Sequence, residues 1–200
     1  MRNAPGRFAS HLRRIVLSCT AFIVLSGFAT AQDLQFKVDP QHTTIKLTLS
    51  DVLHTVHGSF QLIRGDLRFD PATNKLAGEI VVDAKSGETG NGMRDRKMHK
   101  EVLESERYPE IVFQPERVEG TVTLQGNSLV RVHGIFSIHG AEHEVTVPAE
   151  ISISPDRWTA NLHFSVPYVS WGMKNPSTLF LRVSGTVEVE VRASGTVATP

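Results

Sequence analysis

Apolar and polar residues alternate along most of the chain beyond residue 32, and this alternation is the dominant pattern of the sequence. Successive side chains of a strand point to opposite faces of a sheet, so a period of two predicts strands with one buried face. The clearest alternation predicts strands over 75–84, 128–138, 142–153, 160–168 and 182–192. Less regular alternation predicts four more strands, near 34–39, 43–49, 58–70 and 110–119.

The strand predicted over 58–70 changes face partway along its length. Phe60 and Leu67 fall on opposite faces, although both are apolar. An extra residue in one strand reverses the face that follows it, so we expect a bulge or a turn near Gly65.

One segment lacks the alternation. Met93–Arg107 has no β-branched run and is rich in helix formers. Asn91 or Gly92 is suited to cap a helix here, and Pro109 is suited to stop it. We therefore expect one short helix, near residues 93–106, among eight or more strands.

Antiparallel strands of this kind bury their apolar faces either by pairing two sheets or by closing into a barrel. The pattern predicts an all-β fold but does not decide between these arrangements. A barrel of about eight strands encloses an interior that side chains fill or that holds one ligand. Gly78, Gly134 and Gly185 lie on apolar faces, which fits strong curvature or internal space, and equally fits ordinary glycines at bends.

The first 31 residues have the features of a secretory signal peptide. Four arginines and no acid precede an apolar run, Ile15–Ala29, which is shorter than the roughly 20 residues of a membrane span. Ala29-Thr30-Ala31 then predicts cleavage before Gln32. The alternatives are an uncleaved anchor and a lipoprotein modified at Cys19, although the apolar run continues past that cysteine.

Removal of this segment changes the composition of the chain. It carries the only cysteine, so residues 32–200 have no thiol for a disulfide, a metal site or a nucleophile. It also carries 4 of the 21 basic residues and none of the 21 acids, which leaves 17 − 21 = −4. This mild acidity argues against a nucleic-acid partner. We expect one domain over 32–200, periplasmic or secreted and not membrane-spanning after cleavage.

Six segments share their order and spacing with one known family. They are Phe36–Thr43 (FKVDPQHT), His57–Phe60 (HGSF), Asp66–Asp70 (DLRFD), Thr89–Asp95 (TGNGMRD), Tyr108–Phe113 (YPEIVF) and Phe136–Val145 (FSIHGAEHEV). In these segments the chain, from about 35 to 192, resembles the YceI-like family of exported polyisoprenoid-binding proteins. It departs from the family at Lys97-Met98, at Val102-Leu103 and over 168–177, which bears on ligand identity more than on fold.

The resemblance implies a lipocalin-like antiparallel barrel of about eight strands, with the helix near one end and an isoprenoid or other long-chain lipid inside. No other cofactor is implied. The candidate ligand-binding residues lie on the apolar faces, with Met98 from the helix: Ile80, Val82, Met98, Phe113, Phe136, Ile138, Val145, Val147, Leu162 and Phe164. Ordinary core packing is the alternative for each of them. His42, His57, Arg94 and Asp95 are candidates for a polar barrel mouth or a structural network.

Arg94 and Asp95 begin the predicted helix. An acid in the first turn favours the helix dipole, which is a sufficient structural reason for Asp95. Arg94 is suited to pair with a buried carboxylate such as Asp39 or Asp83, or to meet a polar head group at the mouth.

Two other classes of function stay open at this point. A hydrolase or metal-dependent enzyme on the same barrel would use histidines such as His42 and His57, but zinc-binding, nucleophile-elbow and phosphate-loop motifs are absent, so we expect no catalysis and no metal. An interaction module in envelope stress would show a large exposed apolar patch, for example around Tyr168 and Trp171, and no cavity. The sequence does not choose between transport, storage and sensing, and leaves open whether the protein is a homodimer.

Overall fold

The computed structural model describes residues 32–50, 55–177 and 182–198. Nine strands make up most of it: β1 (Leu34–Val38), β2 (Thr44–Ser50), β3 (Thr55–Asp70), β4 (Lys75–Glu88), β5 (Glu110–Glu119), β6 (Gly126–Ile138), β7 (Ala141–Ile153), β8 (Arg157–Val166) and β9 (Val187–Ala198). A 3₁₀ turn, η1 (Pro40–His42), follows β1, and a helix formed by α1 (Gly92–Lys97) and the π-helical turn η2 (Met98–Val102) follows β4.

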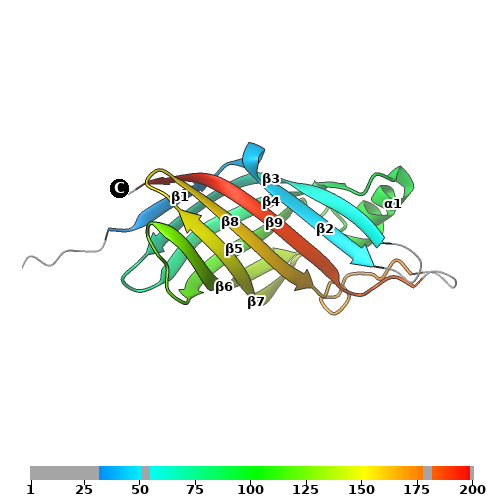
Figure 1. Cartoon of the computed structure of the whole chain (residues 1–200). Helices are drawn as coiled ribbons and strands as arrows, with labels where there is room; N and C mark the ends of the chain where they lie inside the picture. The colour runs from blue at the N-terminus through cyan, green and yellow to red at the C-terminus, as the bar shows by residue number, and fades with distance from the viewer. Residues whose placement is uncertain (1–31, 51–54, 178–181, 199–200) are drawn as a thin grey trace, which may run out of the picture. The chain divides into compact units, whose positions relative to one another are not determined.

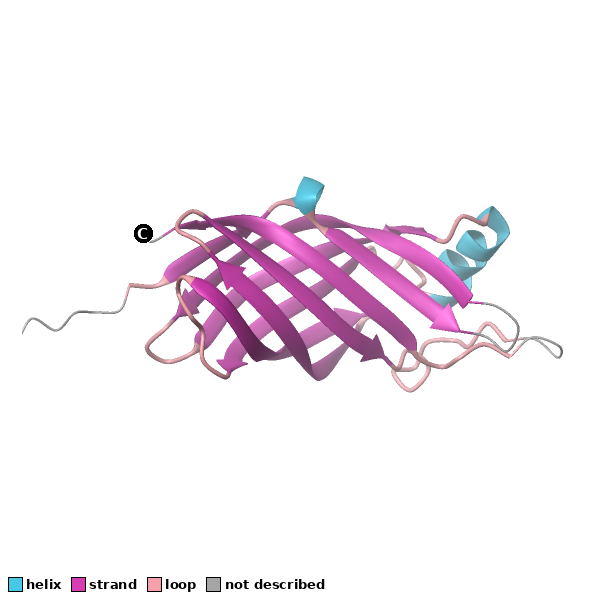
Figure 2. Ribbon diagram, in the orientation of Figure 1, coloured by secondary structure: helices cyan, strands magenta, loops and turns pink. Residues whose placement is uncertain are grey.

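The strands form one closed antiparallel barrel (Figures 1 and 2). From β3 the order runs through β2, β9, β8, β7, β6 and β5 to β4, which pairs with β3 again and closes eight positions. The ninth strand, β1, pairs with the same two neighbours as β2, namely β3 and β9. β1 and β2 therefore share one position of the barrel in tandem, with η1 between them. The all-β barrel that the resemblance implied is confirmed.

The alternation located the strands better than it located their ends. β9 ends at Ala198 and not near 192, because β1 pairs with its last residues across Gln35–Val38. The helix begins where predicted, with the Asn91 side chain accepting hydrogen bonds from the N–H groups of Met93 and Arg94. It ends at Val102, earlier than the expected 106, because the chain turns through Ser105–Tyr108 before Pro109.

The expected irregularity in β3 is present. The register between β3 and β4 shifts between Leu62 and Arg64, immediately before Gly65, which moves Phe60 and Leu67 to the same inner side of the barrel. Two apolar-face glycines mark places where backbones approach closely. A Cβ atom at Gly78 would overlap the carbonyl oxygen of Asp66, and one at Gly134 would overlap that of Gln114. These glycines serve close packing at bends, and neither lines internal space.

Gly78→Ala is expected to lower the free energy of unfolding by about 3 kcal/mol, because the new methyl group both overlaps Asp66 and meets a backbone with φ of +112°. Gly90→Ala is the matched control: φ there is +75°, but nothing lies within 4 Å of the added Cβ. We expect the control to cost only about 1 kcal/mol. Urea unfolding of both variants measures the difference, and equal losses would contradict the close approach at Gly78.

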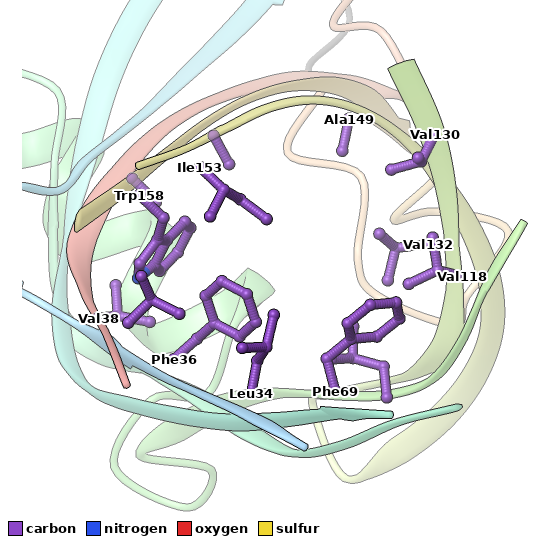
Figure 3. Packing of buried hydrophobic residues seen from close by; sticks show 14 of the residues in the cluster. Leu34, Phe36, Val38, Phe69, Val118, Val130, Val132, Ala149, Ile153 and Trp158 are labelled. Atoms are coloured by element: carbon purple, nitrogen blue, oxygen red, sulfur yellow. The ribbon is translucent and has the colours of Figure 1, made fainter. Parts of the chain in front are cut away.

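The buried apolar side chains gather in two clusters inside the barrel. One includes Leu34, Phe36, Phe69 and Trp158 near the end formed by β1, and Figure 3 shows these side chains pointing into the barrel. The other includes Ala84, Val102, Leu103, Ile111, Ile138, Val166, Tyr168 and Met173, at the end that carries the helix. Among the described residues, no helix combines the length and the apolar character that crossing a membrane requires.

Candidate functional site

A cavity of about 680 Å³ lies inside the barrel. Strands β2 to β9, Val38 of β1 and the helix all contribute to its wall. The wall is almost entirely aliphatic and aromatic, and its few polar residues are Thr43 on one side and Thr89, Asn91, Arg94 and Lys97 around the start of the helix. The cavity is of the size at which protein pockets hold small ligands, and its lining favours an apolar one.

The burial of the inner wall shows that side chains do not fill the interior. Ile80, Phe113, Phe136 and Leu162 point into the barrel and pack against its core, yet they are only half-buried. In a filled barrel, residues on the inner face lose nearly all of their accessible surface. Here part of each side chain borders the cavity, so apolar surface is available for a ligand to cover.

Nine of the ten sequence-predicted ligand-binding residues line this cavity: Ile80, Val82, Met98, Phe113, Phe136, Ile138, Val147, Leu162 and Phe164. Val145 does not line the cavity, although it lies two residues before Val147 on β7 and so faces the same side of the strand. The structure adds lining residues from strands that the prediction left out, above all Leu47 of β2 and the valines of β9.

An aromatic pair forms the floor of the cavity at the β1 end. The rings of Phe36 and Trp158 meet edge to face with centroids 5.7 Å apart. The Trp158 indole N–H donates to the carbonyl oxygen of Lys37 at 3.4 Å, which ties the ring to β1. Trp158 lines the cavity while only 6% of its surface is exposed, so its ring separates the cavity from the core below it. Sequence reasoning missed Trp158, although it stands at an alternating position of β8.

A polar network holds the start of the helix at the opposite end. The Asp95 carboxylate accepts hydrogen bonds from the backbone N–H and the hydroxyl group of Thr89. The Arg94 guanidinium donates to the Thr89 hydroxyl oxygen at 2.7 Å and to its carbonyl oxygen at 2.8 Å. Arg94 thus bonds to Thr89, and not to Asp39 or Asp83 as the sequence suggested. It also lines the cavity, whereas Asp95 does not.

Segment 167–177, which contains the atypical residues 168–177, packs over the same end of the barrel. Tyr168 is buried and its hydroxyl group donates to the carbonyl oxygen of Ser184 at 2.7 Å; burial raises the pKa of this phenol. Met173 is also buried and lines the cavity. Trp171 stacks on the His143 imidazole with centroids 4.1 Å apart and an interplanar angle of 6°. It also meets the Phe136 ring at 5.8 Å, so this segment covers part of the inner wall.

Two lysines connect the helix to this segment. Lys97 donates to the carbonyl oxygen of Pro176 at 2.9 Å, and Lys174 forms an ion pair with Glu101 at 2.7 Å. The Lys174 ammonium group holds the pKa of Glu101 below its ordinary value. These two side-chain contacts therefore connect the helix to segment 167–177 at this end of the cavity.

The stacked His143 gives this end a predictable response to pH. Its Nε2 atom is buried without a hydrogen-bond partner among the described residues, and burial lowers the pKa of the imidazole below 6.5. The folded protein therefore favours the neutral ring. This preference stabilises the fold above the unfolded-state pKa and is lost as the pH falls below it.

We therefore expect the wild-type protein to lose more unfolding free energy than His143→Phe between about pH 8 and about pH 5. Urea unfolding of both proteins at each pH measures this difference. The other titrating groups are the same in the two proteins, so their contributions cancel when the two free energies are subtracted. A His143→Phe variant that loses as much stability as the wild type over this interval would show that the imidazole is not held neutral.

His42 and His57 lie away from the cavity. His42 places Nδ1 2.7 Å from the Oδ2 atom of Asp39, and the Oδ1 atom of Asp39 accepts from the N–H of Gln41 in η1. These hydrogen bonds, that from His42 above all, lower the pKa of Asp39. His57 is exposed and meets the hydroxyl of Thr48 at 3.2 Å. Within the described ranges, no group of three or more His, Cys, Asp or Glu side chains is arranged to hold a metal ion.

A closed antiparallel barrel with an apolar internal cavity defines a lipocalin-like protein. The sequence model of the family described as YceI-like domain matches residues 36–194, and the chain belongs to this family. No curated protein matches the chain.

Solved structures share this fold at low sequence identity. BcnA of Burkholderia cenocepacia is 18% identical with a TM-score of 0.64, over 81% of this chain and 99% of its own. A polyisoprenoid binding domain from Saccharophagus degradans, implicated in plant cell wall breakdown, is 14% identical with a TM-score of 0.63, over 82% of this chain and 98% of its own. A YceI protein of Campylobacter jejuni is 16% identical with a TM-score of 0.56, over 72% and 86%.

Proposed function

We propose that this protein binds an isoprenoid or a similar long-chain lipid inside its barrel, without catalysing a reaction. The observation that carries the proposal is the apolar cavity of about 680 Å³ between the Phe36–Trp158 floor and the helix. The polyisoprenoid binding domain of Saccharophagus degradans, which has the same fold, supports the isoprenoid class. The ligand-binding residues are the nine predicted residues that line this cavity, while Arg94 and Asp95 order the mouth.

The physical basis of binding is the removal of hydrocarbon from water. Each methylene group that enters the cavity contributes about 0.8 kcal/mol, so a long chain gains affinity without many polar contacts. The half-buried faces of Phe113, Phe136 and Leu162 are covered at the same time. Such a ligand needs an apolar space of adequate length and one polar end, and the polar residues of the wall gather mainly around the helix.

The remaining features of the chain fit this function. The segment 1–31, which lies outside the described residues, is proposed to direct export to the periplasm or the medium and then to be cleaved. There the barrel would carry or store a lipid that water does not dissolve. A hydrolase or metal enzyme has no support from His42 and His57, which lie apart from the cavity. The hypothesis of an interaction module predicts no cavity and an exposed apolar patch around residues such as Tyr168. Tyr168 is buried instead.

Native mass spectrometry of the purified protein, followed by organic extraction, tests the proposal. We expect an adduct of one lipid for each chain, released by the solvent, and we expect the extracted protein to take up one equivalent of an offered polyprenol. The absence of a co-purified lipid together with no uptake of polyprenol would overturn the proposal.

A further inference from the structure

The helix carries exposed basic side chains next to an exposed methionine that also lines the cavity. Met93 has 74% of its surface exposed, and Arg96 and Lys100 are also exposed. We call these three residues the basic mouth face. Within the described part of the chain, the side chains of Arg96 and Lys100 make no hydrogen bond and no ion pair. An exposed apolar side chain on the same short helix as two unpaired cations is suited to contact a partner that is both anionic and apolar.

The two acidic side chains of the helix make their direct contacts elsewhere, although Glu101 is also attracted by nearby Lys100. The Asp95 carboxylate is occupied by the backbone and hydroxyl group of Thr89. Glu101 forms its ion pair with Lys174. The excess of positive charge is local, because residues 32–200 together carry 17 basic and 21 acidic residues. A cationic face on an acidic chain orients the molecule toward a negatively charged surface.

The basic mouth face lies beside a place where the cavity reaches exposed residues, since Asn91, Met93 and Arg94 are exposed and line it. Met93 itself lines the cavity, as do the neighbouring helix residues Arg94, Lys97 and Met98. The helix lies at the end of the barrel opposite β1, beyond the ends of the neighbouring strands (Figures 1 and 2). At the other end, the Phe36–Trp158 floor closes the cavity. Contact through Arg96, Lys100 and Met93 would therefore bring this part of the cavity wall against the partner.

We propose that the basic mouth face docks on the surface of an anionic lipid bilayer. The lysine and arginine charges attract acidic phospholipid head groups, and Met93 enters the boundary between head groups and acyl chains. Docking in this way gives a membrane-dissolved lipid a path into the cavity that avoids water. The purpose of docking rests on the proposed lipid-binding function, but the docking contact itself does not.

Co-sedimentation with vesicles tests the contact. The full protein is mixed with vesicles of phosphatidylcholine that contain one quarter phosphatidylglycerol, and with vesicles of phosphatidylcholine alone. We expect binding to the anionic vesicles only. It should weaken as salt rises, because the Debye length falls from about 10 Å at 0.1 M to about 3 Å at 1 M. The double variant Arg96→Gln/Lys100→Gln should bind about 30-fold more weakly, since each basic residue contributes about fivefold near such a surface.

The control Lys37→Gln/Lys46→Gln removes two exposed cations from the barrel wall and leaves the basic mouth face intact. We expect it to bind like the wild type. Equal binding to neutral and anionic vesicles, no binding to either, or equal losses in both double variants would overturn the proposal. Binding of a soluble polyanion in preference to vesicles would also overturn it, in favour of a macromolecular partner.

Uptake of a polyprenol delivered from ethanol separates this proposal from the proposed function. We expect Arg96→Gln/Lys100→Gln to take up polyprenol from ethanol as the wild type does, and to acquire it more slowly from anionic vesicles. If no protein took up polyprenol while anionic vesicles still bound the wild type, the proposed function would fail and the docking contact would stand. If the double variant acquired polyprenol from vesicles at the wild-type rate, docking would have no role in loading.

Discussion

Leu162→Trp is expected to weaken binding of a polyprenol more than 100-fold while the barrel stays folded. Leu162 is on β8, lines the cavity and is only half-buried, so a larger side chain has space to occupy. An indole ring there would exclude about four methylene groups of the ligand, each of which contributes about 0.8 kcal/mol. Titration with a fluorescent polyene analogue measures the change in Kd.

The neighbouring residue supplies the matched control for this variant. Asn161 is exposed on the outer face of the same strand and makes no side-chain hydrogen bond with another described residue. Asn161→Trp adds a ring of the same size outside the barrel, and we expect its Kd to equal that of the wild type. Circular dichroism should show the same strand content in both variants. An unchanged Kd for a folded Leu162→Trp would mean that the chain does not enter the barrel.

Trp158→Ala is expected to lower the free energy of unfolding by about 3–5 kcal/mol, the usual cost of removing a buried aromatic side chain. The variant loses the edge-to-face contact with Phe36 and the hydrogen bond to Lys37. Trp158→Phe keeps a ring in place and loses the indole N–H, so we expect it to cost about 1–2 kcal/mol. Urea unfolding measures both values, and a Trp158→Ala variant as stable as the wild type would contradict the role of the floor.

The same substitution should change which ligands fit. Trp158 bounds the cavity at the β1 end. Its replacement by alanine would enlarge the cavity by the volume of the lost ring. Competition among farnesol, geranylgeraniol and solanesol measures the preferred chain length. We expect Trp158→Ala to shift the preference toward the longer alcohols, and the Trp158→Phe variant to shift it less.

Alternation along the sequence was sufficient to predict the strands and most of the inner wall. It succeeded because a strand in a barrel has one buried face, so the parity of Ile80, Phe136 or Leu162 fixes the side on which each lies. Parity alone does not report depth along the barrel. Val145 lies two residues before Val147 on β7 and is still outside the cavity lining. Trp158 was missed because it precedes the strand predicted over 160–168, and its link to β1 is a side-chain hydrogen bond to Lys37.

The end of the barrel was beyond prediction for a different reason. Segment 167–177 has no periodicity, and its placement depends on contacts between residues far apart in sequence. Trp171 packs on His143, and Lys174 pairs with Glu101 on the helix. Arg94 likewise donates to the nearby Thr89 hydroxyl group, whereas the sequence analysis expected a distant carboxylate as its partner. Local hydrogen bonds at a helix start compete with long-range ion pairs, and charge complementarity alone does not rank them.

A crystal structure of the extracted protein with an offered polyprenol tests the central claim most directly. We expect one continuous hydrocarbon chain inside the barrel, ending against Trp158 and placing its polar end near Arg94. An interior closed by repacked side chains, with the polyprenol absent or bound only on the outer surface, would contradict it.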